Sequence, residues 1–70
     1  DDWRNMVRRV IQKGISRGEI RSEVNPDEVA TIMITLLEGA VMMSKLYGDA
    51  IHLERAISHL NYYIQVELQA

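Results

Sequence analysis

The sequence predicts an all-α fold of three helices in a single small domain, with the last two helices forming an antiparallel hairpin. Two observations support this prediction. Apolar residues recur three and four positions apart in three runs, which is the spacing of one helix face. Glycine, asparagine and proline separate the runs where one helix should end and the next begin. We expect helices over residues 1–17, 26–47 and 50–68, and a connector over residues 18–25.

The first helix should begin at Asp1 and Asp2, because carboxylates stabilise the positive end of a helix. Gly18 should end it, since glycine accepts the left-handed conformation of a C-terminal cap. Gly14 lies inside the apolar stripe and marks either a weak point or a close approach by another segment. The stripe comprises Trp3, Met6, Val7, Val10, Ile11 and Ile15.

The second helix has clear limits. Asn25 can cap it, Pro26 suits its first position, and Glu28 can complete a capping box by reaching back to the Asn25 N–H. Gly48 should end the helix, and Asp49 should cap the next one. In the connector before this helix, Ile20 and Val24 should anchor the connector on the core.

The second helix carries more apolar surface than one small domain can cover. Its polar residues form one narrow stripe, which contains Glu28, Thr31, Thr35, Glu38 and Lys45. Two apolar seams share the remaining surface: Val29, Met33, Leu36, Ala40, Met43 and Tyr47 form one, and Ala30, Ile34, Leu37, Val41, Ser44 and Gly48 form the other. Because a surface helix of a monomer needs one such stripe, the second seam predicts a second set of neighbours.

The third helix repeats this pattern with a main stripe and a flanking shoulder. The stripe contains Leu53, Ile57, Leu60, Ile64 and Leu68, and the shoulder contains His52, Ala56, His59, Tyr63 and Val66. We therefore expect the hairpin to pair with its own copy as a four-helix bundle. The residues expected at this homodimer interface are Ile34, Leu37, Val41, Ser44, His52, Ala56, His59, Tyr63 and Val66. The pattern leaves open which seam of the second helix faces the partner.

Length and composition agree with this expectation. A 70-residue domain buries only about 60% of the surface of its unfolded chain, while ordering it costs on the order of 100 kcal/mol in conformational entropy. The chain contains no cysteine, so neither a disulfide nor a thiolate metal site can supply extra stability. Association with a partner chain is the remaining way to stabilise so small a domain. Since the first residue is not methionine, we expect the chain to be a piece of a longer protein.

The composition also predicts where the protein works. Absence of cysteine fits a reducing compartment, and we expect no apolar run to approach the roughly 20 residues of a bilayer span. We therefore expect a soluble cytoplasmic protein without membrane contact. No histidine, serine and carboxylate are spaced as a catalytic triad, and no enzyme activity or cofactor is expected. His52 and His59 lie about 10 Å apart along one helix, too far to share a metal ion.

Several short segments together resemble the C-terminal region of tetracycline-repressor (TetR) type bacterial transcription regulators. They are Gly18-Glu19-Ile20, then Asn25-Pro26-Asp27-Glu28-Val29-Ala30, then Leu36-Leu37-Glu38-Gly39, and the turn Leu46-Tyr47-Gly48-Asp49. The resemblance implies that the last two helices form a homodimer bundle and that the first helix helps to wall a pocket for a small hydrophobic effector. The implied pocket wall comprises Trp3, Met6, Val10, Met33 and Met43. Operator DNA would be bound only by an N-terminal helix-turn-helix, which lies outside this chain.

Two other functions remain open at this stage. The first third of the chain is basic although the net charge is −2, so Arg4, Arg8, Arg9, Lys13 and Arg17 could follow a phosphate backbone as a nucleic-acid contact module. Alternatively, the chain is a structural fragment of a larger helical protein whose missing helices cover the extra seams.

Overall fold

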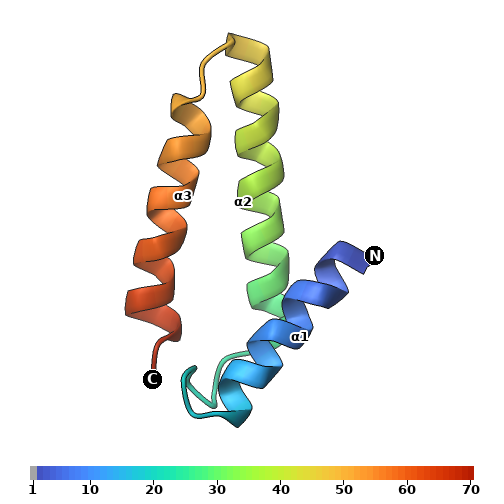
Figure 1. The fold of residues 1–70 in the computed structure, drawn as a ribbon, viewed down its shortest axis with the longest axis vertical. Helices are drawn as coiled ribbons and strands as arrows, with labels where there is room; N and C mark the ends of the chain where they lie inside the picture. The colour runs from blue at the N-terminus through green and yellow to red at the C-terminus, as the bar shows by residue number, and fades with distance from the viewer. Residues whose placement is uncertain (1) are drawn as a thin grey trace.

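The computed structural model describes residues 2–70 as three helices and a short terminal turn. They are α1 (Asp2–Ser16), α2 (Pro26–Tyr47), α3 (Ile51–Tyr63) and the π-helical turn η1 (Ile64–Leu68). Asp1, where the first helix was expected to begin, lies outside the described residues. The helices α2 and α3 form an antiparallel hairpin, and α1 crosses the lower end of α2 (Figure 1). No strand forms within residues 2–70, so the prediction of an all-α fold with three helices is confirmed.

Both ends of α2 follow from local chemistry. The Asn25 side-chain oxygen accepts hydrogen bonds from the backbone N–H groups of Asp27 (2.9 Å) and Glu28 (3.3 Å), which satisfies two free donors of the first turn. No bond from the Glu28 carboxylate back to Asn25 forms in the described part of the chain, so the capping box is half complete. At the other end, Gly48 has a φ of 63°, and its N–H donates to the Ser44 carbonyl.

The end of α3 differs from the continuous helix expected over residues 50–68. The helix begins at Ile51, whose N–H donates to the Asp49 carboxylate at 2.9 Å, and it is α-helical only to Tyr63. The Gln69 N–H then donates to the Ile64 carbonyl at 2.8 Å, which is the wider five-residue step of a π turn. Contacts with the connector, described next, hold the chain in this wider turn.

The connector ties α1 to the end of η1. The Arg21 N–H donates to the Leu68 carbonyl (2.8 Å), and its guanidinium donates to the carbonyls of Gln69 (3.1 Å) and Val66 (3.2 Å). The Ala70 N–H donates to the Glu19 carbonyl at 3.0 Å. We call this set of bonds the connector clasp. The structure thereby brings residues 19–21 beside residues 66–70, which are far apart in sequence.

A small core lies where the three helices meet. Ile11 of α1, Val29 of α2 and Leu68 of η1 are buried together. Six partly buried apolar side chains pack around them, namely Val7, Ile15, Ile20, Val24, Met33 and Tyr63. The predicted anchoring of the connector by Ile20 and Val24 is confirmed.

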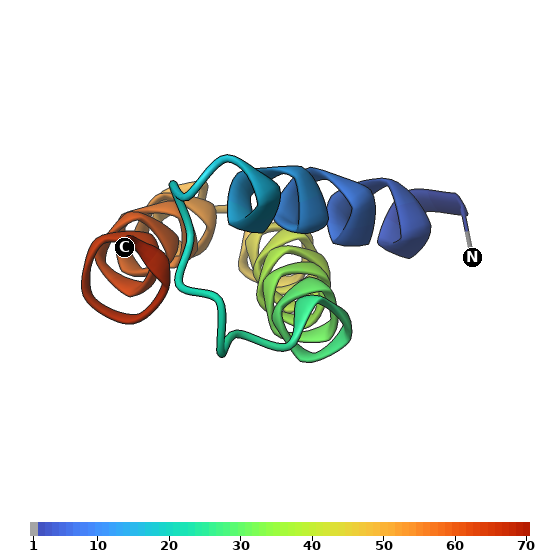
Figure 2. The ribbon, with the colours of Figure 1, turned by 90° about the horizontal axis from the view of Figure 1, so that it is seen from below.

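The molecule is a thin slab rather than a sphere. Its extents are 40 × 26 × 14 Å, and its radius of gyration of 13.1 Å exceeds the roughly 11 Å of a compact 70-residue domain. Its accessible surface of 5115 Å² exceeds the approximately 4,500 Å² of a compact monomer of this mass. Figure 2 shows α1 on one side of the plane that contains α2 and α3, and no described helix on the other side.

The apolar character of α2 requires a correction. Pro26–Tyr47 contains an 18-residue window with a mean hydropathy of 1.6, which by length and composition alone is enough to cross a membrane. The expectation that no run approaches this limit was therefore wrong. The core helix of a water-soluble domain passes the same test, because both require a long apolar surface. In this fold, α1 and α3 both pack on α2.

Candidate functional site

The side of the hairpin away from α1 carries two adjoining grooves between α2 and α3. Their α2 residues are spaced three or four positions apart, so they belong to one stripe of the helix, and their α3 residues follow the same rule. We call this surface the open face. It comprises Glu28, Ile32, Thr35, Leu36, Gly39 and Met43 of α2, with His52, Arg55, Ala56, Tyr63 and Glu67 of α3 and η1.

The open face is apolar in its middle and charged at its ends. Arg55 borders the groove near the tip of the hairpin, while Glu28 and Glu67 border the groove near the connector. The Tyr63 phenol lies at the acidic end, and its pKa is raised above 10.0 by burial first and then by the negative charges of Glu67 and Glu28. Both carboxylates line the same groove as the phenol.

The side of the hairpin that carries α1 has an apolar surface of its own. Trp3 of α1 and Leu37, Val41 and Met42 of α2 line a hollow, with Glu38 at its edge. We call it the Trp3 hollow. Trp3 is 50% exposed and Met42 is 69% exposed, which is unusual for side chains of this size. Met6 and Val10 continue the exposed apolar stripe along α1.

The residues expected at the dimer interface fall on different sides of the slab. His52, Ala56 and Tyr63 border the open face, and the exposed His59 and Val66 continue its α3 stripe. The residues from α2 lie elsewhere: Leu37 and Val41 line the Trp3 hollow, and Ile34 is only 7% exposed. The Ser44 hydroxyl is buried without a hydrogen-bond partner among the described residues. The structure therefore does not bring the two halves of the expected interface together.

The five residues expected to wall a pocket are also dispersed. Trp3 lines its hollow, Met6 and Val10 border a separate shallow surface with Arg9 and Lys13, and Met33 packs against the core. Met43 lies on the open face, away from the other four. Sequence reasoning named Met42 among the methionines that could line a pocket but left it out of the expected pocket wall. It missed Gly39 and Arg55, which have no apolar side chain to mark them.

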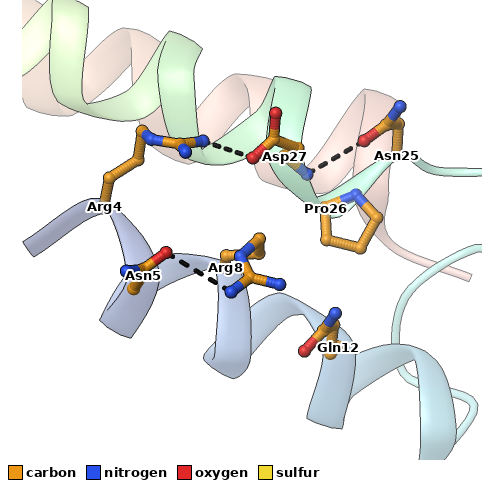
Figure 3. A pocket seen from close by; sticks show the side chains of 7 residues that line it. All are labelled: Arg4, Asn5, Arg8, Gln12, Asn25, Pro26 and Asp27. Carbon is orange, nitrogen blue, oxygen red and sulfur yellow. Dashed lines mark hydrogen bonds and ion pairs between the residues drawn. The ribbon is translucent and has the colours of Figure 1, made fainter. Parts of the chain in front are cut away.

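A polar hollow lies between α1 and the start of α2 (Figure 3). Arg4 of α1 forms an ion pair with Asp27 of α2, and the Arg8 guanidinium donates to the Asn5 side-chain oxygen at 3.3 Å. Arg4 and Arg8 are thus used in contacts within the chain. The Arg4–Asp27 pair helps to fix the angle at which α1 crosses α2. Together the two contacts account for part of the basic stripe that suggested a phosphate contact.

The histidines pack against tyrosines rather than meeting at a metal site. The ring centroids of His52 and Tyr47 are 5.4 Å apart, and those of His59 and Tyr62 are 6.4 Å apart. Within residues 2–70, no group of three or more histidine, aspartate or glutamate side chains could hold a metal ion.

Residues 2–70 form a three-helix slab with apolar surfaces on both of its sides. Residues 1–60 match the family model of the tetracyclin repressor-like C-terminal domain. The chain is also similar to a TetR transcriptional regulator from Chloroflexus aurantiacus J-10-FL, with a TM-score of 0.93 and 43% sequence identity over 99% of this chain. The chain belongs to the tetracycline-repressor family, as a C-terminal domain.

The chain spans 35% of the length of that regulator. No curated protein matches it. Membership of this family supports a module of a regulator, and it does not favour the nucleic-acid contact module as the function of this chain. The resemblance drawn from the sequence is confirmed.

Proposed function

We propose that this chain is the homodimerisation module of a TetR-type, ligand-responsive transcriptional repressor and that it also supplies one wall of the effector pocket. One observation carries the proposal: the 14 Å slab exposes apolar surfaces on both of its sides. Within residues 2–70 of one chain, neither the open face nor the Trp3 hollow is covered by another helix. Because the two surfaces lie on opposite sides of the hairpin, each can bind a different partner.

The open face is the surface that we assign to the second copy. Its apolar middle is broad and contains small residues, which allow two helices to approach within roughly 8–10 Å. His52, Ala56, His59, Tyr63 and Val66 would take part from α3, as the sequence suggested. From α2 we assign Leu36, Gly39 and Met43 to the interface, in place of Leu37 and Val41.

The Trp3 hollow is the surface that we assign to the effector. Its lining of an indole, aliphatic side chains and a methionine suits a small hydrophobic molecule, because such pockets combine mostly apolar walls with few polar groups. It forms one wall only, so the remaining helices of the full-length protein would complete the pocket. Operator DNA would be bound by those missing parts, and the protein would work in the cytoplasm.

Gly39 provides the sharpest test of the dimer. A Cβ built at Gly39 meets nothing within 4 Å, so a larger side chain fits the isolated chain without strain. Gly39→Arg should nevertheless abolish dimerisation, because the twofold interface would bury two additional charges. Sedimentation equilibrium of the 70-residue chain would measure the effect.

Two matched variants complete the design. Gly39→Ala adds only a methyl group and should leave the dimer intact, with a slightly more stable helix. Val41→Asp places a charge on the opposite side of the same helix, so the dimer should persist. If Val41→Asp separates the copies while Gly39→Arg does not, the partner occupies the α1 side of the hairpin and our assignment of the faces is reversed.

A further inference from the structure

We infer that the second copy lies head-to-tail on the open face, so that Arg55 of each chain faces Glu67 of the other. The inference rests on the proposed function, since it requires a dimer through this face. It adds the orientation of the two copies and names Arg55 and Glu67 as the residues that select it.

The charges of the open face lie too far apart to pair within one chain. Twelve positions separate Arg55 from Glu67, which corresponds to about 18 Å along the helix. This separation exceeds the Debye length of about 8 Å at physiological ionic strength. Within residues 2–70, neither side chain takes part in an ion pair or a hydrogen bond. A partner that brings a negative group to Arg55 and a positive group to Glu67 would satisfy both ends.

A second copy can stack on the open face in two twofold orientations. If the twofold axis runs parallel to the helices, the tip of one hairpin lies over the tip of the other, and α2 of each chain lies over α3 of its partner. Glu28 would then face Glu67 of the other chain, twice, and Arg55 would face the uncharged middle of α2. Like charges brought together across an interface disfavour that arrangement.

If the axis crosses the hairpin, the two copies lie head-to-tail and α3 packs on α3. The residue midway between Arg55 and Glu67 is Asn61, which lies near the middle of the segment from Ile51 to Leu68. Full overlap of the two hairpins therefore places Arg55 within about one helical turn of Glu67 of the other chain. The same axis passes α2 near Thr35 and Gly39, where small side chains permit close contact.

Glu67→Arg distinguishes the two orientations by the sign of its effect. In the head-to-tail dimer, the new arginine faces Arg55 of the partner, and the dissociation constant should rise about tenfold. In the other orientation, the new arginine faces Glu28 of the partner, and the dimer should tighten. Analytical ultracentrifugation of the 70-residue chain at low salt measures the constant, and added salt should reduce the change.

A double variant separates charge pairing from damage to η1. Arg55→Glu alone should also weaken the dimer about tenfold, whereas the Arg55→Glu/Glu67→Arg chain restores opposite charges and should return close to the original constant. Lys45→Glu, a cation change on a residue that lines neither groove, should have little effect. A tighter or unchanged Glu67→Arg dimer, or a double variant no better than the single ones, overturns the head-to-tail orientation. A monomeric unmodified chain would overturn the proposed function itself.

Discussion

Tyr63 shows how single residues of the open face respond to their surroundings. Its ring packs against the core, while its hydroxyl is subject to the charges of Glu28 and Glu67. A phenol held in such a place resists ionisation, because burial and nearby carboxylates both disfavour the phenolate. The ionisation of Tyr63 therefore reports on the charges at the acidic end of the open face.

The pH dependence of stability should reveal this tyrosine. Because its pKa in the folded chain lies above the ordinary 10.0, the contribution to stability is complete below pH 10 and is lost as the pH rises through the folded value. The unfolded chain releases its proton first, so unfolding becomes easier in that range. Urea unfolding at several alkaline pH values would measure the loss, and Tyr63→Phe should remove this part of it.

A charge variant checks the cause of the shift. Glu67→Gln should lower the pKa of Tyr63 toward 10.0 without restoring it fully, since burial is the larger cause. Phenolate absorbance in a chain with Tyr47→Phe and Tyr62→Phe isolates the Tyr63 signal. Glu54→Gln, on the exposed side of α3, serves as the control. An unchanged titration in the Glu67 variant would show that the carboxylate does not act on this phenol.

At the scale of elements, the connector clasp determines how α3 ends. Arg21 supplies three donors to carbonyls that a helix end leaves without partners. Because residues 19–21 lie only a few positions after the end of α1, the clasp joins the first helix to the last turn of the hairpin. Glu67, one of the two carboxylates at the acidic end of the open face, lies in this turn.

Removing the Arg21 side chain should loosen that turn. In Arg21→Ala, the carbonyls of Val66 and Gln69 lose their guanidinium donor, and we expect a loss of about 1 kcal/mol in unfolding free energy. Amide hydrogen exchange at Gln69 and Ala70 should accelerate more than exchange in α2. Arg17→Ala, which removes an exposed cation near the end of α1, is the control. Equal exchange in both variants would show that the clasp does not hold the turn.

The limits of the elements could be predicted from the sequence where one residue decides them. Asn25 and Pro26 start α2 and Gly48 ends it, because a side-chain cap, a fixed φ and a left-handed conformation are local properties. The π turn could not be predicted, since its wider step is held by Arg21, which lies more than forty residues earlier in the chain.

The surfaces of the candidate site were harder to predict than the helices. Both seams of α2 repeat with the same spacing, so the sequence does not show which one α1 crosses. The structure places Leu37 and Val41 on that side. Gly39 also lies on the open face, but a glycine contributes nothing to an apolar pattern. The position of α1 depends on contacts such as the Arg4–Asp27 pair, which join distant parts of the chain.

At the scale of the whole molecule, the extended shape links folding to association. The accessible surface is about 600 Å² larger than that of a compact monomer, and the core has few buried side chains. A second copy would cover part of the excess. Folding of the chain should therefore depend on its own concentration.

Thermal unfolding tests this coupling directly. If the folded state is a dimer, the transition midpoint should rise by several degrees when the chain concentration increases a hundredfold, because mass action favours association. Circular dichroism at two concentrations would measure the midpoint. Gly39→Arg should unfold at a lower temperature that no longer depends on concentration. A concentration-independent midpoint in the unmodified chain would instead indicate a monomer that is stable by itself.

The 14 Å thickness of the slab has a mechanical consequence. Between the Trp3 hollow and the open face there is one layer of helices and no further core to absorb a displacement, since packed side chains are nearly incompressible. A molecule that fills the hollow and moves α2 by an ångström would shift Gly39 and Met43 on the far side by a similar distance. Binding in the Trp3 hollow would thus be transmitted through the hairpin and would change the contacts of a second copy packed on the open face.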